Sequence, residues 1–299
     1  MQPFEEARRA LLATVAALAL STLAAGGCSS QRLVVVDPPA GVDGDADLGM
    51  RDAGVSLQPD LGIQPGLLDG IVGYWRLDDG PSSSARDGSG RGNNGVLISL
   101  DRTTAWVPGW SGQGLLTDGM GWVVVPPSAS IDSITDSVTV AGWVYLDGVI
   151  DLWATMLSRQ IGSTIEQHYH VSLNPERRPN VFMTTTTKTA LLTAPDPVAP
   201  RTWVHLAVTY DGTTARLYVD GVAAPGAMMQ ITGSFAADTT PVILGGNAND
   251  ANGVATELFP GRVDELMLYR RALTAEEIAR LHAGELLPTA NAGRDAGAD

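Results

Sequence analysis

Seven Asp-Gly pairs punctuate the chain between residues 69 and 221, many of them beside short apolar runs. Such a pair between apolar segments is a strong local signal for a β-hairpin turn, because its residues tolerate positive φ. Many short strands joined by such turns are typical of an antiparallel sandwich or jelly roll. The pairs are Asp69-Gly70, Asp79-Gly80, Asp87-Gly88, Asp118-Gly119, Asp147-Gly148, Asp211-Gly212 and Asp220-Gly221.

The clearest predicted hairpin lies around Asp211-Gly212. In residues 203–210 the side chains alternate between two faces, and the even-numbered positions form an apolar inner face. After the turn, residues 215–220 return with Leu217 and Val219 on that same face. Residues 137–146 are instead apolar on both faces, which predicts a central strand that is covered on both sides.

One segment, residues 274–284, has a convincing helical pattern. Thr274 and Glu277 form a capping box, Leu273 and Ile278 can form a hydrophobic staple, and Gly284 ends the helix. The predicted fold class is therefore all-β: a two-sheet antiparallel jelly-roll sandwich with one short C-terminal helix.

The N-terminus is predicted to be a targeting signal rather than part of the folded domain. Arg8 and Arg9 precede an apolar run over residues 10–20, and small residues then lead to Cys28, the only cysteine of the sequence. This order predicts a signal peptide over residues 1–27. The residues before Cys28 resemble a bacterial lipobox, although Ala25 stands where leucine is usual. Lipidation at Cys28 would anchor the protein to a membrane without spanning it; the alternative is ordinary cleavage near Ala25.

By resemblance to bacterial sorting rules, Ser29 and Ser30 after the cysteine imply the outer membrane or the cell surface. Residues 28–68 are rich in Asp, Gly and Pro and are predicted to be a disordered acidic linker. Residues 288–299 are predicted to be a disordered tail. The net charge of −14 would repel phosphate backbones, which argues against a nucleic-acid partner.

Three motifs within residues 70–285 occur in an order that resembles bacterial LamG-like jelly-roll domains. They are the Gly73–Gly80 segment with its Gly/Asn loop, the hairpin over 203–221, and the Phe259–Ile278 segment. The resemblance implies a LamG-like domain of the laminin G and concanavalin A-like superfamily over residues 69–287. It also implies carbohydrate or an extracellular protein as partner, with the membrane contacted only through the lipid anchor.

The resemblance further implies a structural calcium where the first strand and its loop meet the last strand. Calcium prefers six to eight oxygen ligands from carboxylates, amides and backbone carbonyls. The alternative is that Asn93-Asn94-Gly95 is only a turn and that Asp264 pairs with Arg262. The candidate ligands are Asp79, Asp87, Asn93, Asn94 and Asp264.

A ligand face is harder to place, because most aromatic residues of a sandwich belong to its core. Trp106, Trp110, Trp122, Trp143 and Trp153 are all able to stack on sugar rings. Trp110 lies in a Pro-Gly-Trp-Ser-Gly loop and is the best exposed candidate; the polar loop with Asn247, Asn249 and Asp250 suits a rim site. The alternative for that loop is simple solvation.

No catalytic motif stands out. Glucanases of this fold use paired carboxylates on one strand, but Glu257 and Glu265 lack a partner at alternating spacing. His168 and His170 would share a strand face and would need a third ligand to hold a metal. We therefore expect a lipid-anchored binding module rather than an enzyme. A structural envelope component and a degenerate hydrolase are the alternatives.

Overall fold

The computed structural model describes residues 65–286 except 151, 163, 165 and 249–253. The predicted signal peptide, Cys28, most of the predicted linker and the predicted tail lie outside the described residues, as do Asn249 and Asp250. No helix in the described part of the chain is long and apolar enough to cross a membrane.

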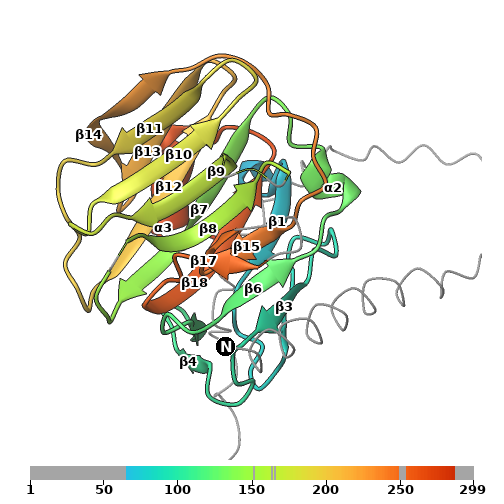
Figure 1. Ribbon diagram of the computed structural model, residues 1–299, viewed down its shortest axis with the longest axis vertical. Coiled ribbons are helices and arrows are strands. Elements are labelled where there is room, and N and C mark those ends of the chain that lie inside the picture. The colour runs from blue at the N-terminus through green and yellow to red at the C-terminus, as the bar shows by residue number, and fades with distance from the viewer. Residues whose placement is uncertain (1–64, 151, 163, 165, 249–253, 287–299) are drawn as a thin grey trace, which may run out of the picture. The chain divides into compact units, whose positions relative to one another are not determined.

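Two antiparallel sheets form the domain, as predicted (Figure 1). The strands of the first sheet, in spatial order, are β14 (Val222–Gln230), β13 (Thr214–Val219), β12 (Trp203–Tyr210), β7 (Val138–Leu146), β18 (Gly261–Tyr269), β5 (Gln113–Leu116) and β4 (Trp106–Pro108). Strand β1 (Ile71–Trp75) pairs with β18 beside this row. Early and late strands therefore meet in the middle of one sheet, which is the jelly-roll arrangement.

The second sheet faces the first across the core. Its strands, in spatial order, are β11 (Thr189–Thr193), β10 (Pro179–Thr184), β9 (Gln167–Leu173), β8 (Ala154–Gln160), β15 (Val242–Leu244), β6 (Trp122–Val125), β3 (Gly95–Ile98) and β2 (Ser84–Ala85). A separate small ribbon pairs β16 (Asn247–Ala248) with β17 (Ala255–Thr256). The helical elements are η1 (Pro65–Leu68), α2 (Ala129–Asp132) and α3 (Ala275–His282).

The predicted hairpin is confirmed. Strands β12 and β13 pair with Tyr210 opposite Ala215. Asp211 Oδ1 accepts hydrogen bonds from the backbone N–H groups of Thr213 and Thr214, and Gly212 has a φ of 89°. Positive φ is inexpensive for glycine, so this turn fixes the register of the two strands. The even-numbered residues of β12 are buried between the sheets.

Strand β7 is the predicted central strand that is covered on both faces. Val140 and Val144 belong to the core between the sheets, whereas Ala141 and Trp143 point to the outer face of the first sheet and are also buried. Helix α3 covers part of that outer face through Ile278 and other apolar residues. The predicted capping box is present at its start.

The domain begins slightly earlier than the sequence suggested. Pro65–Leu68 lies within the segment predicted to be a linker, but it forms the short helix η1. Leu67 is fully buried in the apolar cluster that lies beneath α3. Two leucines after Pro65 and Gly66 are too few to show a period, so the burial of Leu67 follows from tertiary contact alone.

Candidate functional site

The outer face of the second sheet carries a cluster of three rings, two of which are partly exposed. His170 on β9 and Phe182 on β10 are register partners, and their rings stack with centroids 5.7 Å apart. Trp153, which directly precedes β8, meets Phe182 edge-on at 5.4 Å. Trp153 and Phe182 are half-buried, whereas His170 is buried. Because neighbouring strands hold two of these rings in register, the cluster is a preformed platform.

A polar group borders these rings. Glu257 lies between β17 and β18, and its backbone C=O accepts a hydrogen bond from Thr155 N. Its carboxylate accepts a hydrogen bond of 2.7 Å from Asn247 Nδ2. Glu257 Oε2 also lies 3.9 Å from His170 Nε2, which is 2.8 Å from Thr155 Oγ1. The small ribbon β16–β17 therefore brings a carboxylate and an amide against the second sheet.

Glu257 adopts a backbone φ of 48°, which is uncommon for a residue with a side chain. Such strain is held in place only where the surrounding structure fixes it. Here Asn247 bonds the side chain and Thr155 bonds the backbone. The carboxylate is consequently presented at a defined position.

The electrostatics of this site are unusual because its acid lacks a cation. Burial raises the pKa of Glu257, although the hydrogen bond from Asn247 opposes this shift. Burial lowers the pKa of His170 to about 3, so its imidazole is neutral at physiological pH. The contact between Glu257 and His170 is therefore one between a carboxylate and a neutral ring. In the described residues, Glu257 forms no ion pair with Arg or Lys.

Several hydrogen-bonding atoms beside the platform lack a partner. Asn180 on β10 follows the same alternation as Phe182 and is only 1% exposed. Its Nδ2 donates to Thr193 Oγ1 over 2.8 Å, but its Oδ1 has no partner within the described part of the chain. Asn247 Oδ1 is in the same state. A buried acceptor without a donor is costly, so both oxygens are suited to a ligand that brings donors.

The predicted ligand residues divide between different places. Asn247 belongs to the platform on the second sheet. Trp110 lies against the first sheet, where its ring stacks on Trp143 with centroids 4.0 Å apart. Sequence reasoning did not single out Phe182 or Asn180. Alternation within 179–184 was the only available signal, and it cannot show which face of a sheet remains uncovered.

The predicted calcium ligands also contact different partners. Asp87 accepts hydrogen bonds from four donors in its own loop and on β1, and Asn94 Oδ1 accepts from Asp87 N. Asp79 Oδ2 accepts from Arg86 N. The Asn93 side chain bonds to Val72 O, Ser128 Oγ and Ser130 Oγ. These contacts hold the early loop together with protein donors.

Asp264 is engaged elsewhere. Its Oδ2 accepts hydrogen bonds from Trp110 N and Ser111 N, and its Oδ1 accepts from Glu265 N. Arg262, its alternative partner from the sequence, pairs with Asp147 instead at 3.1 Å. The described residues contain no group of three or more His, Cys, Asp or Glu side chains placed to hold a metal. Asp264 and the residues of the early loop have separate hydrogen-bond partners, and calcium binding stays a prediction.

His168 lies two residues before His170 on β9 but has different partners. Its Nε2 is 3.3 Å from Asp238 Oδ2, and its ring meets the edge of Phe235. Burial lowers the pKa of His168 to about 4. The two histidines therefore serve separate contacts.

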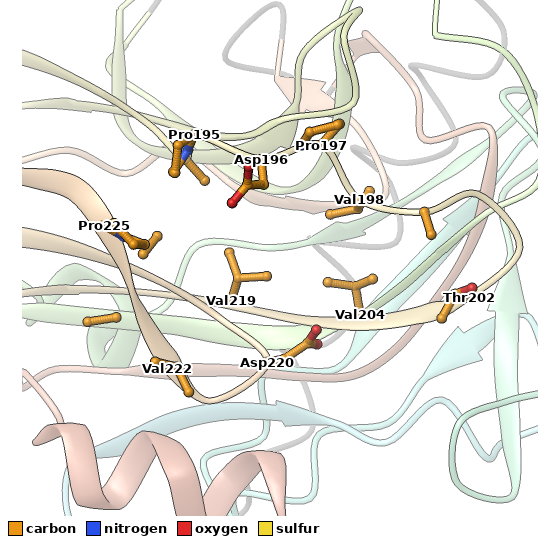
Figure 2. A pocket seen from close by; sticks show the side chains of 14 residues that line it. Pro195, Asp196, Pro197, Val198, Thr202, Val204, Val219, Asp220, Val222 and Pro225 are labelled. Atoms are coloured by element: carbon orange, nitrogen blue, oxygen red, sulfur yellow. The ribbon is translucent and has the colours of Figure 1, made fainter.

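A cleft of about 310 Å³ lies at another part of the domain, between the 194–202 loop and β12–β14 (Figure 2). Val204, Val219 and Val222 line one side, and Pro195 and Pro197 line the other. The described lining includes no aromatic ring. Asp220 directly follows β13 and lines this cleft. Its carboxylate already accepts a hydrogen bond from His205 N. The ring platform therefore offers more for recognition than this cleft does.

Comparison with known proteins identifies the family. Residues 117–279, more than half of the chain, match the family described as the concanavalin A-like lectin/glucanases superfamily. The chain therefore belongs to this family. Mouse pappalysin-1 is 35% identical over 82 residues, which are 26% of this chain and 5% of that protein. The chain thus matches only a small part of this relative.

Two solved structures share the fold. Domain 4 of AbnA, an extracellular GH43 arabinanase of Geobacillus stearothermophilus, gives a TM-score of 0.55 at 17% identity and covers 71% of this chain. The match spans 98% of that domain, whose structure holds arabinotriose. Trypanosoma rangeli sialidase gives 0.54 at 16% identity over 73% of this chain and 33% of the sialidase chain.

These similarities correct the prediction that the chain is not an enzyme. The prediction relied on the missing pair of carboxylates on one strand. Related folds occur in an arabinanase and in a sialidase, so the fold is one that glycosidases contain. The absence of one strand motif does not exclude that class.

Proposed function

We propose that the chain is a carbohydrate-binding protein and that it binds sugar on the outer face of the second sheet. The observation that carries this proposal is the partly exposed Trp153–Phe182 pair beside unpartnered acceptors. Aromatic faces stack on the apolar faces of sugar rings, and fixed polar groups select the hydroxyls. Asn247 and Asn180 supply such acceptors here. The arabinotriose bound to the similar arabinanase domain supports a saccharide ligand.

The test is a glycan array, followed by titration calorimetry with the best ligand and with arabinan oligosaccharides. Trp153→Ala should weaken binding about tenfold or more, because stacking and apolar burial are lost together. Phe182→Leu should weaken it less, since an apolar surface remains.

Trp110→Ala is the control, because Trp110 stacks against the first sheet. If Trp110→Ala abolishes binding while Trp153→Ala does not, the ligand site is the Trp110 loop and this proposal fails. Reducing ends released from a bound glycan are measured in the same samples, which would reveal hydrolysis on this face.

We also propose that Cys28 is acylated and that the domain is displayed from a membrane, in agreement with the basic, apolar and small-residue order of the N-terminus. Expression in a bacterial host should place the protein in the membrane fraction. Cys28→Ser should move it to the soluble fraction. Membrane association that persists in Cys28→Ser would contradict acylation.

Calcium binding at the early loop is a separate proposal. Calcium titration of the full-length protein, followed by Asp87→Asn, tests it. Heat of binding that is lost in the variant supports a site there. Equal behaviour with calcium and with chelator contradicts it.

A further inference from the structure

The hydrogen-bonding atoms around Glu257 bear on the class of sugar. Asn247 uses its Nδ2 donor on Glu257, which leaves Asn247 Oδ1 without a partner. Asn180 uses its donor on Thr193, and its Oδ1 is unpartnered; the hydroxyl of its register partner Ser172 is unpartnered too and can donate. Beside Glu257 itself, Asn247 offers an acceptor, so a ligand group that binds there must donate.

The negative charge of Glu257 further narrows the class of sugar that this face can bind. The Glu257 side chain is 20% exposed, and the ring nitrogen 3.9 Å from its carboxylate belongs to His170, which is neutral. A partly buried carboxylate without a cation is costly, and an opposite charge within about 4–6 Å favours it. An ammonium group carries that charge and three hydrogen-bond donors. A carboxylate on the ligand would instead be repelled by the negative charge of Glu257.

We propose that this face selects an amine-bearing sugar, a hexosamine without its N-acetyl group, and that Glu257 is the counter-ion of the ammonium. The inference rests on the proposed function, since it assumes a saccharide on the Trp153–Phe182 platform. Asn247 then has two tasks: its Nδ2 orients the carboxylate, and its Oδ1 accepts a second ligand hydrogen bond. Acidic sugars are disfavoured by the same carboxylate.

The experiment compares matched ligands by titration calorimetry on the full-length protein. Glucosamine tetramer and N-acetylglucosamine tetramer share the same sugar backbone. They differ in charge and in the number of hydrogen-bond donors. The wild-type protein should bind the glucosamine tetramer at least about tenfold more tightly, as expected for a charge-assisted hydrogen bond. A galacturonate tetramer should bind most weakly of the three.

Glu257→Gln should abolish the preference between the two tetramers while it retains binding of the acetylated one. Glutamine keeps an acceptor for Asn247 Nδ2 and the volume of the side chain, so the fold should be retained; thermal unfolding checks this. Glu276→Gln is the matched control, because Glu276 is exposed on α3, which covers the other sheet. It should leave both affinities unchanged.

The outcomes separate the two proposals. If a neutral glycan binds and Trp153→Ala abolishes that binding, but no preference for the amine exists, the proposed function stands and the amine inference fails. A preference that survives Glu257→Gln also overturns the inference. If no saccharide binds, both proposals fail.

Discussion

The outer faces of the two sheets carry similar side chains but differ in what covers them. On the first sheet, Trp143 is 5% exposed and stacks between Trp110 and His282 of helix α3. On the second sheet, the pair formed by Trp153 and Phe182 remains partly exposed. Residue type alone therefore does not distinguish a structural ring from a recognition ring; the element packed over it does.

The acids of the two faces differ in the same way. Asp264 and Glu265 lie in an irregularity of β18 and are almost fully buried. Three backbone N–H groups bind Asp264, and the Tyr74 hydroxyl donates to Glu265. Glu257 on the other face has an amide and a neutral ring as its side-chain contacts. Asp264 is satisfied by backbone donors, whereas Glu265 Oε1 has no hydrogen-bond partner among the described residues and lies 3.9 Å from Arg76 Nε. Glu257 differs in that it forms no ion pair with Arg or Lys among those residues.

The largest expected effect is a difference in unfolding free energy between alanine variants of Trp143 and Trp153. Trp143→Ala should cost about 3–5 kcal/mol of unfolding free energy, the usual range for a buried large aromatic side chain. Trp153→Ala should cost clearly less, because part of its ring is already in water. Urea denaturation of both variants measures this difference. Equal losses would break the contrast between a covered face and an open one.

The second effect is a pH dependence of stability that comes from the covered face. Burial raises the pKa of Asp264 to about 8 and that of Glu265 to about 7. Since both values lie above those of the unfolded chain, the folded protein holds protons that the unfolded chain releases. Their stabilisation is therefore complete below about pH 4 and is lost as pH rises to about 8.

The range above about pH 7.5 isolates this effect. The buried histidines have lowered pKa values in the folded state, so the unfolded chain, in which histidine titrates near about pH 6.5, gives a slope of opposite sign that fades above about pH 7.5. Unfolding free energy should fall with rising pH, by at most about 1.4 kcal/mol per unit for each acid. Glu265→Gln keeps an acceptor for Tyr74 and should make the slope shallower. An unchanged slope would show that Glu265 does not titrate there.

The smallest effect concerns the helix that covers the first sheet. Thr274 Oγ1 accepts a hydrogen bond from Glu277 N, and Glu277 Oε2 accepts one from Thr274 N. Thr274→Ala should cost about 1 kcal/mol of stability, as is typical for loss of an N-cap. Saccharide binding should not change. A loss of binding in this variant would couple the two faces and weaken their separation.

Predictions from local sequence patterns were confirmed where all the residues involved lie in one segment. The Asp211-Gly212 turn, the alternation in β12 and the capping box of α3 each depend on residues close in sequence, and the structure confirms them. The binding-site residues could not be predicted in this way, because they come from segments far apart in the sequence. Asn247 lies at the platform, but its partner Glu257 comes from the segment after β17, and Phe182 comes from a distant hairpin. No spacing rule connects these positions.

The sequence by itself determined the fold class, the main hairpin, the central strand and the terminal helix, because turn chemistry and hydrophobic period act over a few residues. Only the tertiary structure decided which part of each outer face is covered. Helix α3 folds back over part of the first sheet, whereas Trp153 and Phe182 on the second sheet stay partly exposed. That choice depends on long-range packing between segments, which a strand's alternation cannot specify, because alternation assigns two faces without naming the one that meets solvent.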